Sequence, residues 1–299
     1  MRWATFDLAE GDTRTGVVVD EEVRALAPGV SLVDLLGDDG ERLTQAGERA
    51  MADPADVVRL DQVRLRPPLK PPVFRDHYAF EEHVRWGRQS RGLDMDPVWY
   101  ELPVFYFSNP YSIVGPDAPI PRPPETAQLD FELEVAAVVG MPGYDIPVEE
   151  AERHIAGYML LNDWSARDVQ RREMQLNLGP HKGKDFATSI GPFLVTPDEL
   201  ADRRKGKGYD IALTATVNGR VYSQGNWADI GYSFAEFLAY ESRGTKVGVG
   251  DLVGSGTCGT GCILELSARF GTDAYPWLQP GDVVELRAER LGTLHNKIV

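Results

Sequence analysis

The stretch Asp130-Phe-Glu-Leu-Glu-Val-Ala-Ala-Val-Val-Gly140 alternates acidic with apolar side chains and then continues as an apolar run. Because side chains of a β-strand point alternately to its two faces, Glu132 and Glu134 should project together from one face. Two like charges directed into one space raise each other's cost, so such a pair needs either a wet face or a bound cation. For this stretch alone, an exposed strand face and a metal site both remain open.

Extended segments dominate the sequence around this strand and predict a β-rich α+β fold with peripheral helices. Strands are expected at 104–108, 112–114, 130–139, 158–161, 211–217 and 283–287, and helices at 80–91, 148–155, 166–176 and 233–242. The pair Asn218-Gly219 predicts a hairpin turn, because both residues tolerate a positive φ.

Residues 1–68 are predicted to form a small N-terminal α+β domain, and residues 69–299 the main domain. The first part combines short strands at 2–8, 15–20, 23–27 and 62–65 with a helical stretch at 31–52. The segment Arg66-Pro-Pro-Leu-Lys-Pro-Pro72 follows, and its prolines interrupt both helix and sheet. The domain boundary is therefore expected there.

The composition argues against several classes of partner. Lys and Arg total 31 against 46 for Asp and Glu, which gives a net charge of −15, so neither nucleic acid nor an anionic membrane is expected. The N-terminal residues lack the apolar stretch of a secretory signal, and no run of about 20 apolar residues occurs, so a cytoplasmic location is expected. A small anionic substrate would need local positive charge or a bound cation.

The two cysteines, Cys258 and Cys262, are expected to be reduced thiols in a strand region, since no second pair completes a four-ligand zinc site. Beside them, Gly254-Ser-Gly-Thr-Cys-Gly259 has the glycine spacing of a dinucleotide-binding turn. The segment 262–270 is predicted to be a strand rather than a helix, which argues against nucleotide binding. The glycines are expected to allow close approach of the backbone to the active site.

Further candidate ligands lie outside the acidic strand. Asp163 ends an apolar strand and is predicted to be either a helix N-cap or a ligand. Asp76 and His83 are seven residues apart and would point the same way if a helix began early, although His83 could equally be a surface or core histidine. A set of oxygen ligands suits Mg²⁺, Mn²⁺ or Ca²⁺ rather than zinc.

From about residue 74 to the C-terminus, the motifs resemble in order and spacing those of the fumarylacetoacetate hydrolase family, in particular its fumarylacetoacetase-like branch. The matching segments are 76–83, 102–106, 129–134, 162–170, 178–184, 255–257 and 264–267. The resemblance implies a mixed β-sandwich roll for the catalytic part, usually assembled as a homodimer.

The resemblance also implies roles for individual residues. The implied ligands of a divalent cation, with Mg²⁺ first and Mn²⁺ or Ca²⁺ as alternatives, are Asp76, Glu132, Glu134 and Asp163. His83 is the implied general base, oriented by Glu265, and Lys184 and Arg167 are the positive residues at the reacting centre. The implied substrate contacts are Tyr78, Tyr106, Gln170 and Thr257, while Arg85, Arg88 and Arg91 compete for a distant carboxylate of the substrate.

These roles imply a metal-dependent hydrolase that cleaves a carbon–carbon bond in a small, anionic diketo- or oxo-acid, such as a fumarylacetoacetate or an acylpyruvate. Two alternatives remain. The same metal–enolate chemistry would serve a decarboxylase, isomerase or hydratase of 2-oxo-dioates in aromatic catabolism. A non-catalytic metal-binding scaffold is the alternative from another class.

Overall fold

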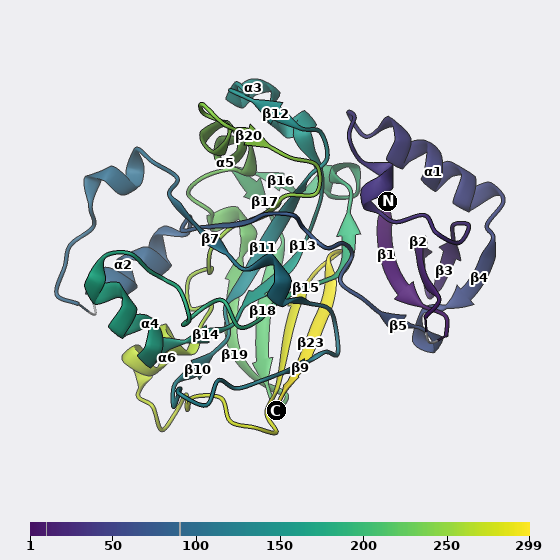
Figure 1. Cartoon of the computed structure of the whole chain (residues 1–299). Helices are drawn as coiled ribbons and strands as arrows, with labels where there is room; N and C mark the ends of the chain where they lie inside the picture. The colour runs from purple at the N-terminus through teal and green to yellow at the C-terminus, as the bar shows by residue number, and fades with distance from the viewer. Residues whose placement is uncertain (10, 90) are drawn as a thin grey trace.

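The computed structural model describes residues 1–299 except residues 10 and 90, and its main feature is one large mixed sheet (Figure 1). Its strands, in sheet order, are β4 (Asp56–Arg59), β3 (Glu22–Ala25), β2 (Thr13–Val19), β1 (Arg2–Asp7), β15 (Thr188–Val195), β13 (Ile155–Asp163), β11 (Leu133–Val139), β21 (Leu252–Gly254), β6 (Phe74–His77) and β7 (Phe105–Ser108). Two short strands extend it: β5 (Arg64–Leu65) pairs with β1, and β8 (Ile113–Val114) pairs with β15.

A second sheet packs against the middle of the first and makes the molecule a sandwich. Its order is β19 (Arg220–Asn226), β18 (Ala212–Val217), β22 (Val283–Ala288), β23 (Gly292–Ile298) and β9 (Pro119–Ile120). Leu133 and Val135 of β11 share one core with Leu213 and Leu286 of this sheet. The predicted strand-rich α+β fold is confirmed, and the turn at Asn218-Gly219 has the predicted positive φ at both residues.

The opposite face of the large sheet is also covered. Ala136 and Val138 of β11 belong to a second core with Trp3 of β1 and with Leu43 of helix α1 (Glu41–Ala52). The predicted helical stretch 31–52 contains only this helix and a short 3₁₀ turn, because Gly37 and Gly40 adopt positive φ before it. Since β1 pairs with β15, the N-terminal strands continue the large sheet, while a domain boundary at residue 68 stays a prediction.

The remaining helices lie at the ends and edges of the sheets (Figure 1). They are α2 (Glu81–Gln89), α3 (Val148–Ala151), α4 (Arg167–Glu173), α5 (Phe234–Glu241) and α6 (Ile263–Phe270). The helix expected at 80–91 therefore ends at Gln89, and residue 90 lies outside the described residues. Within the described part of the chain, no helix is both long and apolar enough to span a membrane.

The prediction of a strand at 262–270 was wrong, because α6 occupies nearly all of this segment. The Asp130 carboxylate accepts hydrogen bonds from the N–H groups of Ile263 and Leu264 at 2.7 and 2.9 Å. A distant carboxylate therefore satisfies the free amides of the first helical turn. Ile263 and Leu266 are buried, as expected for one face of a short amphipathic helix.

Gly256, in the loop after β21, has a positive φ of 75°, and a Cβ there would lie 2.5 Å from the His77 carbonyl oxygen. Gly219 has a similar φ of 78°, but no atom lies within 4 Å of its Cβ position. We expect Gly219→Ala to lower the free energy of unfolding by about 1 kcal/mol and Gly256→Ala by about 2–4 kcal/mol. Urea unfolding measures both, and equal losses would contradict the close approach at Gly256.

Candidate active site

Three acids of the central stretch are buried in or beside the large sheet. Asp130 belongs to the short strand β10 (Leu129–Asp130), Glu132 forms an isolated bridge with Cys262, and Glu134 lies in β11. Glu132 and Glu134 are 3% and 0% exposed, so the interpretation as an exposed strand face was wrong. The strand is buried on both sides, because the two cores cover its two faces.

Two further acids reach the same space from neighbouring strands. Asp76 lies in β6 and accepts from the Gly256 N–H at 3.1 Å, and Asp163 ends β13. The Tyr106 hydroxyl of β7 bonds to both carboxylates, at 3.3 Å to Asp76. Asp163 is not the helix N-cap that was one of its two predicted roles, because α4 begins only at Arg167. Nor does Asp76 share a helix with His83, since α2 begins at Glu81.

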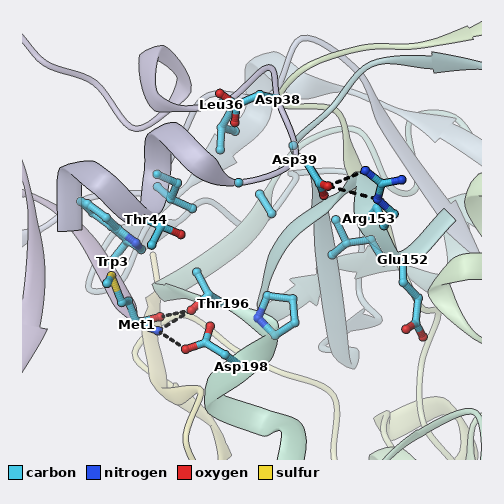
Figure 2. A pocket seen from close by; sticks show the side chains of 16 residues that line it. Met1, Trp3, Leu36, Asp38, Asp39, Thr44, Glu152, Arg153, Thr196 and Asp198 are labelled. Carbon is cyan, nitrogen blue, oxygen red and sulfur yellow. Dashed lines mark hydrogen bonds and ion pairs between the residues drawn. The ribbon is translucent and has the colours of Figure 1, made fainter. Parts of the chain in front are cut away.

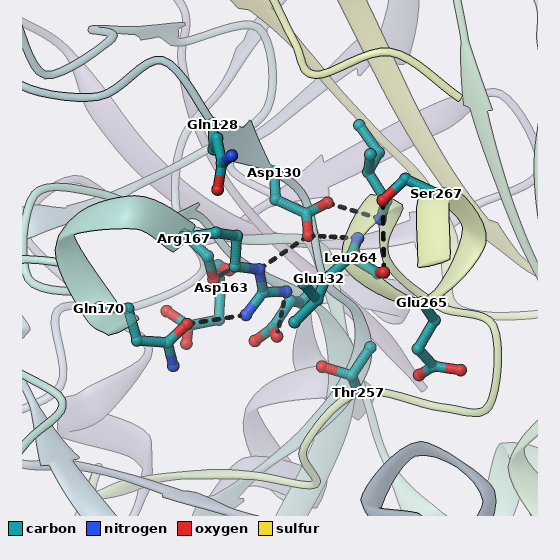
Figure 3. A network of polar contacts seen from close by, with 12 residues as sticks. Gln128, Asp130, Glu132, Asp163, Arg167, Gln170, Thr257, Leu264, Glu265 and Ser267 are labelled. Carbon is teal, nitrogen blue, oxygen red and sulfur yellow. Dashed lines mark hydrogen bonds and ion pairs between the residues drawn. The ribbon is translucent and has the colours of Figure 1, made fainter. Parts of the chain in front are cut away.

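Two buried cations lie among these acids. The Lys184 ammonium contacts Asp163 at 2.7 Å and also bonds to Glu132. Arg167, the first residue of α4, donates to Asp130 at 2.8 Å and to Glu132 at 2.7 Å, as Figure 3 shows. The resemblance implied that both cations act on the substrate, and the structure shows that both are already paired with acids.

The pKa values of the acids follow from burial and from the position of the two cations. Burial, with the nearby Asp163 charge, raises the pKa of Asp76 to about 8. Burial also raises the pKa of Glu134, where Asp76 and Glu132 add repulsion, and that of Asp163, although Lys184 opposes it there. At Glu132, Lys184 and Arg167 overcome the effect of burial and hold its pKa below the usual range.

The cluster has the features of a site for a hard divalent cation. Acids outnumber cations, and two buried carboxylate oxygens, Glu134 Oε2 and Asp163 Oδ1, have no hydrogen-bond partner among the residues that the structure describes. Unpaired buried carboxylate oxygens are costly unless a cation binds them. All four predicted ligands offer oxygen atoms, as Mg²⁺, Mn²⁺ and Ca²⁺ prefer. The residues therefore fit the implied metal. In this structure the Lys184 ammonium contacts two of the four predicted ligands, Asp163 and Glu132.

A second cluster lies at the start of α6. His83, on α2, bonds through Nδ1 to Glu265 Oε1, and Glu265 Oε2 accepts from the Thr260 N–H at 2.9 Å. Both side chains are buried, at 8% and 3% exposure. Within the described residues, His83, Glu265 and Cys262 are also the one group of three whose ligand atoms all lie within 4.8 Å of one another.

The predicted substrate contacts divide between the two clusters. Tyr78 meets the His83 ring edge-on at 5.5 Å, and burial raises its pKa to about 12, so its hydroxyl stays protonated. Gln170 accepts from Arg167 at 3.1 Å, and Thr257 donates to Glu134 at 3.3 Å. In Figure 3 the side chain of Gln170 points toward Arg167, whereas that of Glu265 points away from it.

The three competing arginines are exposed or half-buried on or after α2. Arg85 pairs with Glu81, Arg88 lies 3.7 Å from Asp96, and Arg91 donates to the Gly87 carbonyl at 2.8 Å. The Arg91 charge acts on Tyr78, where it lowers the pKa that burial raises. Of the three arginines, Arg91 is therefore the one whose charge acts on Tyr78, a predicted substrate contact.

Sequence reasoning missed three residues of the site. Asp130 was quoted but given no role, although it shares its alternation with Glu132 and Glu134. Asn162 was also given no role, and its Oδ1 accepts from the Glu132 N–H at 2.9 Å. Cys262 was expected in a strand region and instead precedes α6, beside His83. The helix after the glycine-rich turn does not restore nucleotide binding, because Asp130 already occupies its N-terminal amides.

Two cavities adjoin these parts of the molecule. One of about 400 Å³ is lined by Tyr106, Tyr111, His181 and Lys184, so it opens onto the acidic cluster. The other, of about 470 Å³, lies between the N-terminal strands and the main body and is lined by Trp3, Asp39 and Arg153 (Figure 2). It contains none of the predicted site residues, whereas Tyr106 and Lys184 of the predicted site line the first cavity.

Residues 72–299 match the family described as fumarylacetoacetate (FAA) hydrolase C-terminal. The chain belongs to the fumarylacetoacetate hydrolase family. The resemblance of the motifs is thereby confirmed. Enzymes of this family act on small organic acids and typically bind a divalent metal.

Curated relatives in this family have different names. The chain is 32% identical over 284 residues to a fumarylacetoacetase of Arabidopsis thaliana, covering 76% of this chain and 67% of that protein. It is also 32% identical over 264 residues to a mitochondrial oxaloacetate tautomerase of Homo sapiens, covering 87% of this chain and 77% of that protein. The relatives therefore include both hydrolases and tautomerases.

Solved structures agree on the fold. The fumarylacetoacetate hydrolase of Exiguobacterium antarcticum superimposes with a TM-score of 0.76 at 28% identity, covering 100% of this chain and 99% of that one. A maleylpyruvate hydrolase from Sphingobium sp. SYK-6, in complex with manganese(II) and pyruvate, gives 0.73 at 21% identity, with 100% and 99% covered. At that identity, the second likeness shows the fold alone.

The raised pKa values predict how the stability of the metal-free protein depends on pH. Between pH 4 and pH 8 the folded Asp76 keeps a proton that the unfolded chain has lost, so the free energy of unfolding falls as pH rises. Each such group contributes at most about 1.4 kcal/mol per pH unit. A divalent cation replaces these protons and should therefore stabilise the protein more at pH 8 than at pH 5.5.

Urea unfolding at both pH values, with and without Mg²⁺ or Mn²⁺, measures this dependence. Glu134→Gln is the matched control, since it keeps the shape and removes one carboxyl whose pKa burial raises. The variant should show a weaker fall with pH and a smaller gain from the cation. An identical response of both proteins would show that the buried acids do not bind the ion.

Proposed function

We propose that the protein is a divalent-metal-dependent hydrolase that cleaves a carbon–carbon bond beside a carbonyl in a small diketo- or oxo-acid of the fumarylacetoacetate or acylpyruvate type. The observation that carries the proposal is the buried His83–Glu265 pair beside the acidic cluster. A histidine held by a carboxylate next to a cation site is the arrangement that general base catalysis needs.

The hydrogen bond fixes which nitrogen of His83 can react. A carboxylate only accepts, so His83 Nδ1 donates to Glu265 Oε1 and its Nε2 keeps a free lone pair. Glu265 is itself held by the Thr260 N–H, which prevents the pair from rotating. Nε2 can therefore take a proton from water, and the resulting hydroxide attacks the substrate carbonyl. The carbon–carbon bond beside that carbonyl then breaks, and the proton held on Nε2 is passed to the departing carbon.

The other residues bind and neutralise the substrate. Lys184 stays cationic, because Asp163 and Glu132 overcome the burial that would lower its pKa. The Tyr78 hydroxyl stays protonated and can donate to an oxygen of the substrate near His83. A divalent cation held by Asp76, Glu132, Glu134 and Asp163 would supply Lewis-acid polarisation of a substrate oxygen. We further propose that the enzyme is cytoplasmic and forms a homodimer. Light scattering measures the molar mass and thus tests the dimer.

A tautomerase is the second candidate. The tautomerase of Homo sapiens covers a larger share of this chain than the fumarylacetoacetase of Arabidopsis thaliana does. The His83–Glu265 pair could serve this reaction by moving a proton between a carbon and an oxygen of an oxo-acid, without attack by water.

Product analysis distinguishes these reactions. Acylpyruvates, fumarylacetoacetate, oxaloacetate and oxo-dioates are incubated with the protein and Mg²⁺ or Mn²⁺, and the products are followed by NMR. We expect two acid fragments from a diketo-acid. Enol–keto exchange alone would show a tautomerase, and release of CO₂ would show a decarboxylase; either result without fragments would exclude the hydrolase.

His83→Ala should lower kcat by about 10²-fold or more, because the group that deprotonates water is lost, while Mn²⁺ binding stays intact. Glu265→Gln should act in the same direction, since a neutral amide holds the imidazole less firmly. His295→Ala is the matched control, because this exposed histidine bonds to Asp117. A near-normal kcat in His83→Ala would remove His83 from the mechanism.

A further inference from the structure

We propose that His83, Cys262 and Glu265 form a second metal site, which binds a borderline or soft divalent cation such as Zn²⁺ and thereby inhibits the enzyme. The site is distinct from the four carboxylates. Only the inhibition rests on the proposed function, because the three side chains supply the ligands whatever reaction the enzyme catalyses.

The geometry of the three side chains carries the proposal. Their ligand atoms all lie within 4.8 Å of one another, and the residues are 8%, 0% and 3% exposed. Tetrahedral zinc with Zn–S near 2.3 Å and Zn–N near 2.05 Å separates sulfur from nitrogen by about 3.6 Å. A shift of about 1.2 Å or less in these separations would therefore bring the three atoms into coordination distance.

The fold supplies these ligands from two elements that meet. His83 comes from α2, whereas Cys262 and Glu265 lie at the start of α6, which Asp130 fixes through its first two amides. The backbone of Cys262 is bridged to Glu132, so the thiol cannot turn away with a flexible loop. The site is thus held by secondary structure on both sides.

The chemistry of the three donors differs from that of the acidic cluster. Sulfur, imidazole nitrogen and one carboxylate oxygen are ligands for Zn²⁺, Co²⁺ or Cd²⁺, whereas Mg²⁺ prefers oxygen alone. Three protein ligands leave a fourth position for water. On binding, the thiol releases its proton to solvent, and metal–sulfur and metal–oxygen bonds form. One ring nitrogen of His83 coordinates through its lone pair, while the ring keeps its proton on the other nitrogen. The negative charges of Asp130 and Glu132 act on the Cys262 thiol, and the positive charge of Arg167 opposes them.

Binding at this site would remove the proposed general base. A nitrogen of His83 that is coordinated to a metal cannot accept a proton, and Glu265 would no longer be free to orient the ring. The second cysteine, Cys258, is buried at 1% exposure only four positions away, yet it does not belong to the group of three ligand atoms. It offers a matched control for thiol chemistry.

Cobalt titration of the full chain, in the presence of saturating Mg²⁺, tests binding without any assay of activity. A cobalt–thiolate bond gives charge-transfer absorption in the near ultraviolet, and Zn²⁺ should remove it by displacement. We expect this absorption at one equivalent of Co²⁺ in the wild type and in Cys258→Ser, and its loss in Cys262→Ser. No absorption in the wild type, or equal absorption in Cys262→Ser, would overturn the proposal.

Inhibition is tested separately on the Mg²⁺-loaded enzyme, with each protein compared with its own zinc-free rate. The Zn²⁺ concentration for half-inhibition should rise at least about tenfold in Cys262→Ser, as expected for loss of one ligand, and stay unchanged in Cys258→Ser. Equal inhibition of all three proteins would overturn the inhibitory role. A protein without hydrolase activity would contradict the proposed function, while the cobalt spectra would still decide the metal site.

Discussion

The structure of the site depends on one constraint, the burial of more carboxylates than cations within one sheet. Taking a charge out of water costs several kcal/mol unless a partner replaces the lost solvation. Lys184 and Arg167 provide partners for Glu132, Asp163 and Asp130, whereas no ion pair within the described part of the chain joins Asp76 or Glu134 to a cation. The remaining charge must be removed by protons or by a bound cation. The strands β6, β11 and β13 therefore hold a cluster that is complete only when it binds something positive.

The sequence predicted the direction of these acids but not their depth. Alternation places Glu132 and Glu134 on one face, and it says nothing about what covers that face. The side chains that contact them there come from distant segments, as Lys184 does for Glu132 and Thr257 for Glu134. Asp130 has the same alternation and was missed, because its partner helix begins 133 residues later in the chain. Contacts at such separations leave no local pattern.

The error at α6 had the same origin. A short run such as Cys-Ile-Leu-Glu-Leu is compatible with both a strand and a helix, and local propensity does not decide between them. The decision is made by Asp130, whose carboxylate satisfies the first amides of the helix. The family motifs did place Glu265 beside His83, since they carry positional information that propensity lacks. Cys262 has no position in those motifs, and only the three-dimensional structure brings it to the pair.

The two clusters are linked through Glu132. Its side chain bonds to both buried cations, and its backbone pairs with Cys262. A cation that binds among the carboxylates would compete with Lys184 and Arg167 for Glu132. Any shift of the Glu132 backbone would also displace Cys262, because the two residues form a β-bridge. Binding at one cluster should therefore change the affinity of the other, and by thermodynamic linkage the effect must be equal in both directions. The two clusters should prefer different ions. The four carboxylates offer only oxygen atoms, which suit hard ions such as Mg²⁺, whereas the second cluster adds sulfur and nitrogen, which suit Zn²⁺.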